Sequence, residues 1–94
     1  MAKSLIQSEK TCYICGSYQW IEEHHVFGGA WRDISERYGL KVYLCHYCHN
    51  EPPNGIHYNI TNNNALKANV QEIAMRKYGW NTAEFIKIFG KNYL

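Results

Sequence analysis

Two C-x-x-C pairs constrain this chain more than any other feature of its sequence. One pair is Cys12 and Cys15, and the other is Cys45 and Cys48, which together account for all 4 cysteines. This spacing lets two thiolates of one tight turn reach a single Zn²⁺, and four thiolates complete a closed tetrahedral site. We therefore expect a structural zinc that joins the N-terminal part of the chain to its middle. The alternative, a redox dithiol or cysteines that simply pack in a core, fits two such pairs poorly.

The chain of 94 residues predicts one domain, with residues 1–10 as a flexible lead-in and residues 61–94 as a helical C-terminal part. A domain of this size buries a limited apolar area, so a structural metal is a reasonable stabiliser. The start of the chain has no apolar export segment, and paired cysteines without one favour metal binding over disulfides. We expect a cytoplasmic protein with no membrane partner, because no apolar run is long enough to span a bilayer.

The order of predicted elements indicates an α+β fold. Residues 19–27 and residues 40–44 are rich in β-branched and aromatic side chains, and we expect them to pair as an antiparallel ribbon. Between them, Asp33 with Glu36 has the pattern of a helix cap, and Gly39 stands where such a helix would end.

Helices are predicted for the rest of the chain. Residues 45–50 begin a helical turn that Pro52 and Pro53 stop. Residues 65–78 carry one apolar face at helical spacing, with N-caps offered by residues 62–64. Asn81 with Glu84 resembles another cap, and it precedes a short terminal helix with the apolar residues Phe85, Ile86, Ile88 and Phe89 that ends at Gly90.

The histidines are the candidates for chemistry. His24 and His25 are adjacent on a predicted strand, so their rings point to opposite faces, and one can bind a metal while the other faces a substrate. His49 directly follows Cys48 and can serve a second metal or merely neighbour the zinc. His57 follows a predicted turn and is either a further ligand or an exposed turn residue. Imidazoles suit Zn²⁺, Ni²⁺ or Mn²⁺, and Mg²⁺ can serve where phosphate and water supply most of the ligands.

Three segments together resemble a known family. They are Cys12-x-x-Cys15, then Glu22-Glu23-His24-His25-Val26-Phe27-Gly28-Gly29, then Leu44-Cys45-x-x-Cys48-His49-Asn50. They are similar to an HNH endonuclease of the zinc-containing His-Me finger (ββα-metal) superfamily, in the form found in phages and prophages. The resemblance runs from about Cys12 to His57, and residues 84–94 also look like the tail of those phage proteins. It implies a small ββα-metal domain with a Cys₄ zinc and C-terminal helices.

The resemblance also implies roles for single residues. His25 matches the general base, while His24 and His49 match ligands of a catalytic divalent cation. His57 has no counterpart in the commonest motif, so its ligand role depends on its position alone. The family's middle Asn, which orients the base, is missing here, and either a backbone carbonyl or Asn50 takes its place.

The implied reaction is metal-dependent hydrolysis of DNA phosphodiester bonds, with His25 activating water. Arg32, Arg37 and Lys41 flank this site as expected phosphate contacts. The helix at 65–78 carries Lys67, Arg76 and Lys77, which either extend that contact or belong to an ordinary solvated face. The expected partners are DNA and phage packaging or recombination proteins. The alternative function is a non-catalytic zinc module that binds nucleic acid or protein; a thiol redox protein is a third reading that the mutually ligating pairs disfavour.

Overall fold

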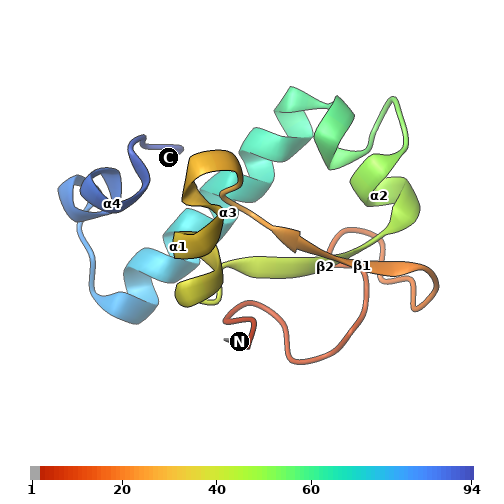
Figure 1. Ribbon diagram of the computed structural model, residues 1–94, viewed down its shortest axis with the longest axis horizontal. Coiled ribbons are helices and arrows are strands. Elements are labelled where there is room, and N and C mark those ends of the chain that lie inside the picture. Colours follow the sequence, from red (N-terminus) through yellow and green to blue (C-terminus); the bar gives the residue numbers. More distant parts are fainter. Residues whose placement is uncertain (1–2) are drawn as a thin grey trace.

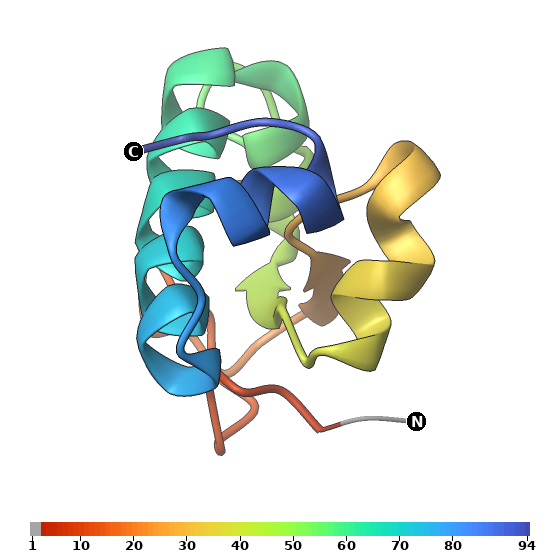
Figure 2. The ribbon, with the colours of Figure 1, turned by 90° about the vertical axis from the view of Figure 1, so that its left-hand side faces the viewer.

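An antiparallel ribbon of two strands lies at the centre of the computed structural model, which describes residues 3–94. Strand β1 spans Ile21–His25 and strand β2 spans Lys41–Cys45. Ile21 pairs with Cys45 at one end of the ribbon, and His25 pairs with Lys41 at the other. The predicted antiparallel pairing is therefore confirmed. Figure 2 shows the ribbon lying between α3 on one side and α1 on the other.

The connection between the strands contains a 3-10 helix, Gly29–Trp31, and the short helix α1, Arg32–Arg37. Gly39 ends this part of the chain with a φ of 71°, a left-handed conformation that glycine adopts without strain. The predicted cap is wrong, because Trp31 occupies the N-cap position and no side chain caps the helix. Asp33 lies in the first turn instead, and Glu36 turns toward the ribbon.

Helix α2, His46–Asn50, follows β2 directly, and a 3-10 helix, Ile56–Tyr58, leads into the long helix α3. Helix α3 spans Ile60–Tyr78, starting five residues before the predicted 65. The reason is the cap: the backbone N–H of Asn62 donates to the Asn59 side chain at 2.9 Å. The predicted end at Gly79 is confirmed, with a φ of 70°.

Helix α4, Thr82–Phe89, begins with the predicted capping box between Asn81 and Glu84 and ends at Gly90. Its Phe85 and Phe89 are buried against Phe27, with ring centroids 5.4 and 4.6 Å apart. The core between the ribbon, α3 and α4 also contains Val26, Leu40, Val42, Leu44, Ile56, Leu66, Val70 and Ala74. Figure 1 shows α4 and α2 at opposite ends of the longest axis.

The segment before the first cysteine pair lies along the free edge of β2. The Ser4 hydroxyl donates to the carbonyl of Lys41 at 2.5 Å, and the Tyr43 N–H donates to the Gln7 side chain at 2.7 Å. Met1 and Ala2, where the expected lead-in starts, lie outside the described residues. Within residues 3–94, no helix is both long and apolar enough to cross a membrane. The fold is thus a small compact α+β arrangement, with a Cα radius of gyration of 12.8 Å.

Candidate metal centres and the cavity beside the histidines

The four cysteines meet in one cluster, as their spacing predicts. Sulfur atoms of Cys12, Cys15, Cys45 and Cys48 all lie within 4.8 Å of one another, and those of Cys15 and Cys45 are 3.6 Å apart. A tetrahedral Zn²⁺ with bonds of about 2.3 Å places its sulfur ligands about 3.8 Å apart. The cluster therefore has the donor set and the spacing of a zinc site, and all four cysteines are free of disulfides.

The electrostatics of these thiols also favour a cation. Burial opposes ionisation of Cys12, but backbone N–H groups, led by that of Cys15, lower its pKa to about 6. Burial and the neighbouring thiols of Cys45 and Cys12 raise the pKa of Cys48. The Cys12 thiolate thus forms readily, whereas the Cys48 thiol resists ionising beside it. A bound Zn²⁺ removes this repulsion, because it deprotonates the thiols that coordinate it.

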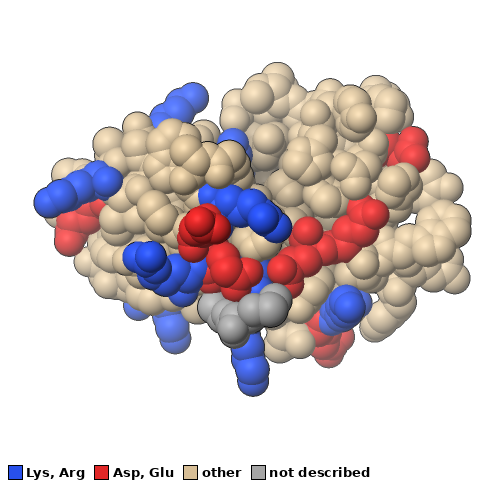
Figure 3. Space-filling model, viewed as in Figure 1, with Lys and Arg blue, Asp and Glu red and all other residues tan. Residues whose placement is uncertain are grey.

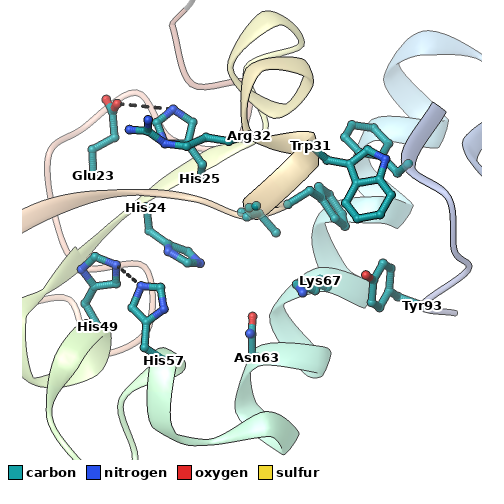
Figure 4. A pocket seen from close by; sticks show the side chains of 15 residues that line it. Glu23, His24, His25, Trp31, Arg32, His49, His57, Asn63, Lys67 and Tyr93 are labelled. Atoms are coloured by element: carbon teal, nitrogen blue, oxygen red, sulfur yellow. Dashed lines mark hydrogen bonds and ion pairs between the residues drawn. The ribbon is translucent and has the colours of Figure 1, made fainter.

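Three histidines form a second cluster on the α3 side of the ribbon. His24 comes from β1, His49 from α2 and His57 from the 3-10 helix before α3. One ring nitrogen of each lies within 4.8 Å of the other two, and the Nε2 atoms of His49 and His57 are 2.9 Å apart. Figure 4 shows the three rings turned toward one another. This is the expected grouping of His24 with His49, and it brings in His57 as well.

His24 has a buried ring nitrogen without a hydrogen-bond partner among residues 3–94, and a bound cation would give this atom a partner. Its residue is 6% exposed, and its Nε2 atom is buried without a hydrogen-bond partner in the described part of the chain. Burial, followed by the charges of His49 and His57, lowers the pKa of His24 to about 3. The ring is therefore neutral at pH 7 and offers a lone pair, and neutral imidazole is the form that binds metals.

Glu22 and Asn50 support this cluster from behind. The Nδ1 atom of His49 lies 2.8 Å from a carboxylate oxygen of Glu22, and the Asn50 amide donates to the same oxygen at 2.8 Å. A carboxylate on the far nitrogen of a ligating histidine fixes the ring and strengthens its donor atom. Asn50 is therefore a support for His49. This corrects the expectation that it orients His25.

His25 points away from the three-histidine cluster, as adjacent strand residues must (Figure 4). Its Nε2 atom lies 2.8 Å from an oxygen of Glu36 on α1, and 3.9 Å from an oxygen of Glu23. Its Nδ1 atom has no hydrogen-bond partner among residues 3–94. Glu36 was missed as a site residue, because its position three residues after Asp33 was interpreted as a capping pattern.

The expected phosphate contacts occupy different environments. Lys41 is 3% exposed, and its ammonium lies 3.0 and 3.1 Å from the two oxygens of Glu36 and 3.5 Å from Glu23. The expected phosphate contact by Lys41 is therefore wrong, since its charge is committed to two carboxylates. Arg32 is exposed and lines the cavity described below, while Arg37 is exposed outside it. Figure 3 shows acidic and basic side chains side by side on the face seen there.

A single cavity of about 530 Å³ is lined both by the three-histidine cluster and by His25. It is lined by His24, His49 and His57, by His25 and Arg32, and by side chains of α3 and the C-terminal segment, among them Asn63, Lys67 and Tyr93. Asn63 has a buried side-chain oxygen without a partner among the described residues. No local pattern marked Asn63 as a site residue, because it lies among the residues predicted to cap the helix.

Lys67 is the notable cation of this cavity (Figure 4). Its ammonium lies 5.2 Å from the centre of the Tyr93 ring, and that of Lys91 lies 5.3 Å from the same ring. No carboxylate pairs with Lys67 anywhere in residues 3–94. Burial, followed by the charge of Lys91, lowers the pKa of Lys67. An unpaired cation held in a cavity favours an anionic ligand.

Compared with protein-family models, with curated proteins and with solved structures, the chain matches none. The residues and their geometry define a small α+β protein with a four-cysteine cluster and a three-histidine cluster. These two features carry the functional argument.

Proposed function

We propose that the chain is a metal-dependent DNA endonuclease of the HNH type within the His-Me finger superfamily. The observation that carries the proposal is the meeting of His24, His49 and His57 in a cavity that His25 also lines. The order of elements supports it, because the ribbon is followed directly by α2, which bears His49. A ββα-metal domain needs two strands and a helix in this order.

The three imidazoles would hold a divalent cation, for which Zn²⁺, Ni²⁺, Mn²⁺ and Mg²⁺ are the candidates. Such a cation would neutralise charge that develops on a phosphodiester and its leaving oxygen. The unpartnered Nε2 atom of His24 and the 2.9 Å separation of the His49 and His57 nitrogens fit this role. Tetrahedral coordination with bonds of about 2.0–2.1 Å puts ligand nitrogens roughly 3.3 Å apart.

His25 then acts as the general base. Its Nε2 atom faces a carboxylate at 2.8 Å, which leaves the lone pair on Nδ1 to accept a proton from water. Arg32 and Lys67 line the same cavity from opposite sides of the ribbon and would contact the phosphate oxygens. Lys67 replaces Lys41 in this role, because Lys41 is already paired.

A second candidate function, a zinc-stabilised binding module without catalysis, is favoured by exposed aromatic side chains beside the cysteine turns. Tyr18, Trp20 and Tyr47 are 77%, 67% and 61% exposed, and the rings of Trp20 and Tyr47 are 6.0 Å apart. Aromatic faces of this kind can stack on bases. DNA as a partner, and phage packaging or recombination proteins as further partners, remain predictions under either function.

Nicking of supercoiled plasmid in the presence of Mg²⁺, Mn²⁺ or Ni²⁺ tests the proposal. We expect the wild type to nick, and His25→Ala to lose at least about 100-fold in rate, since general-base catalysis contributes about 10²–10⁴-fold. Lys67→Ala should raise KM, whereas Lys77→Ala, on the same helix but outside the cavity, is the matched control and should change KM little.

Bound zinc and the far-ultraviolet circular dichroism spectrum should be the same in wild type and His25→Ala. Equal nicking by the two proteins would show that His25 is not the base. A wild type that binds DNA without cutting it under any of the three cations would favour the binding module.

A further inference from the structure

We propose that Glu36, held in place by Lys41, is the positioning residue that fixes the ring of His25 with its proton on Nε2 and its lone pair on Nδ1. This inference rests on the proposed function for its catalytic meaning. The contact itself is independent of any activity.

Distance selects Glu36 over the other acidic residue near this ring. The Nε2 atom of His25 is 2.8 Å from Glu36 Oε1, which is hydrogen-bond distance, but 3.9 Å from Glu23 Oε1. A carboxylate accepts hydrogen bonds and donates none, so the proton of this bond belongs to His25 Nε2. The neutral ring then has its lone pair on Nδ1.

Lys41 makes Glu36 a fixed partner for the ring. The Lys41 ammonium bonds both Glu36 oxygens at 3.0 and 3.1 Å, and its side chain is 4% exposed. Burial opposes its charge, but the hydrogen bond with Glu36, followed by the charges of Glu23 and Glu36, raises the pKa of Lys41. The ammonium therefore stays charged in its position beside Glu36.

The same three side chains, Glu23, His25 and Glu36, have ligand atoms close enough to hold a metal. Lys41 argues against this use, because its ammonium already supplies the positive charge between the two carboxylates. A partly buried ion pair between Glu36 and Lys41 alone is the other alternative. It would stabilise α1 on the ribbon without any effect on the ring of His25.

Two measurements on the full chain separate these alternatives. Long-range ¹H–¹⁵N spectra with ¹⁵N-labelled histidine report the tautomer of His25, and steady-state nicking reports kcat and KM. In the wild type, His25 should be a single Nε2–H tautomer. In Glu36→Ala it should become a mixture, with kcat lower by at least about 10-fold and KM changed little, as expected for a lost orienting partner. Glu36→Gln should recover part of kcat, because its amide oxygen can accept the same hydrogen bond.

Glu23→Gln is the matched control, since it also removes a carboxylate near Lys41 but leaves the 2.8 Å contact. It should keep the wild-type tautomer and a kcat within about 3-fold of wild type. A single Nε2–H tautomer that persists in Glu36→Ala would overturn the inference. A tautomer that depends on Glu36 in a protein that never nicks DNA would support the contact and contradict the endonuclease proposal.

Discussion

His24 is the residue whose environment is hardest to explain without a ligand. A buried polar atom without a hydrogen-bond partner costs free energy, and proteins keep such atoms mainly where function needs them. Here the atom faces two more imidazoles, and burial together with their charges lowers the pKa of His24 to about 3. The environment of His24 therefore disfavours a proton on its ring and leaves the lone pair free to bind a cation.

This environment predicts an acid-dependent loss of stability. The unfolded His24 titrates near 6.5, whereas its folded pKa is about 3. Below pH 6.5 the unfolded chain therefore binds a proton that the folded chain does not, and stability falls as the pH falls. Between pH 7.5 and 5.5, without added cation, His24 should account for a loss of about 1 kcal/mol in the free energy of unfolding.

Urea unfolding at the two pH values measures this loss. His24→Leu, which cannot titrate, should lose about 1 kcal/mol less than wild type over the same interval. His46→Leu is the control of opposite sign, because hydrogen bonds with Glu22 and Glu51 raise the pKa of His46. The protonated His46 stabilises the fold at low pH, and this stabilisation is lost as the pH rises. Replacing His46 should therefore not reduce the loss of stability on acidification. If the free energy of unfolding depended on pH identically in wild type and His24→Leu, the acid-dependent loss could not be assigned to His24.

Helix α1 is the element that brings Glu36 to His25, and one buried serine fixes it. The Ser35 hydroxyl donates to the carbonyl of Leu40 at 2.5 Å and accepts from the N–H of Phe27 at 3.3 Å. Ser35 is fully buried, so these bonds tie α1 to the ends of both strands. A helix this short is not stable by itself. The hydrogen bonds of Ser35 and the ion pair between Glu36 and Lys41 therefore hold α1 in place.

Ser35→Ala should therefore destabilise the protein by about 1–3 kcal/mol, because it leaves the N–H of Phe27 buried and unpaired. Urea unfolding measures the change. Ser17→Ala removes a comparable bond, from the N–H of Gln19 at 3.1 Å, in an exposed turn and should cost less than about 0.5 kcal/mol. Equal costs for the two variants would mean that Ser35 does not anchor α1.

The elements that the sequence predicted well are those with local signals. Both strands, the α4 capping box and the glycine ends of α3 and α4 follow from residues within a few positions of one another. The start of α3 was misplaced because several asparagines could cap it, and the side chain that accepts from the N–H of Asn62 is that of Asn59.

The site residues also divide into those with a local sequence signal and those without one. The cysteine cluster follows from spacing, but the partners of His25 do not. Glu36 is 11 residues from His25 and reaches it only because α1 folds back on the ribbon. Lys41 was misjudged because both faces of β2 are buried, which alternation along a single strand does not reveal. Lys67 enters the cavity through the packing of α3, for which its neighbours in sequence gave no signal.

Across the whole protein, the chain forms two clusters of different chemistry, and α2 contributes Cys48 to one and His49 to the other. Cys45 pairs with Ile21 at one end, and His24 and His25 lie at the opposite end, paired with Val42 and Lys41. The sulfur cluster joins the N-terminal segment to the middle of the chain, while the imidazole cluster joins β1, α2 and the entry to α3. The first arrangement suits a structural role and the second suits a reactive one, because only the second faces the cavity.

The metal content of single variants, measured by native mass spectrometry in the presence of Zn²⁺, tests this division most directly. We predict two bound ions in the wild type, one in His49→Ala with the fold retained, and loss of the sulfur-held ion with a fall in Tm in Cys48→Ser. That fall should be at least about 8 °C if a ligand contributes about 2–3 kcal/mol, because each kcal/mol shifts Tm by about 4–8 °C in a domain this small. A wild type with one ion, unchanged in His49→Ala, would contradict the account.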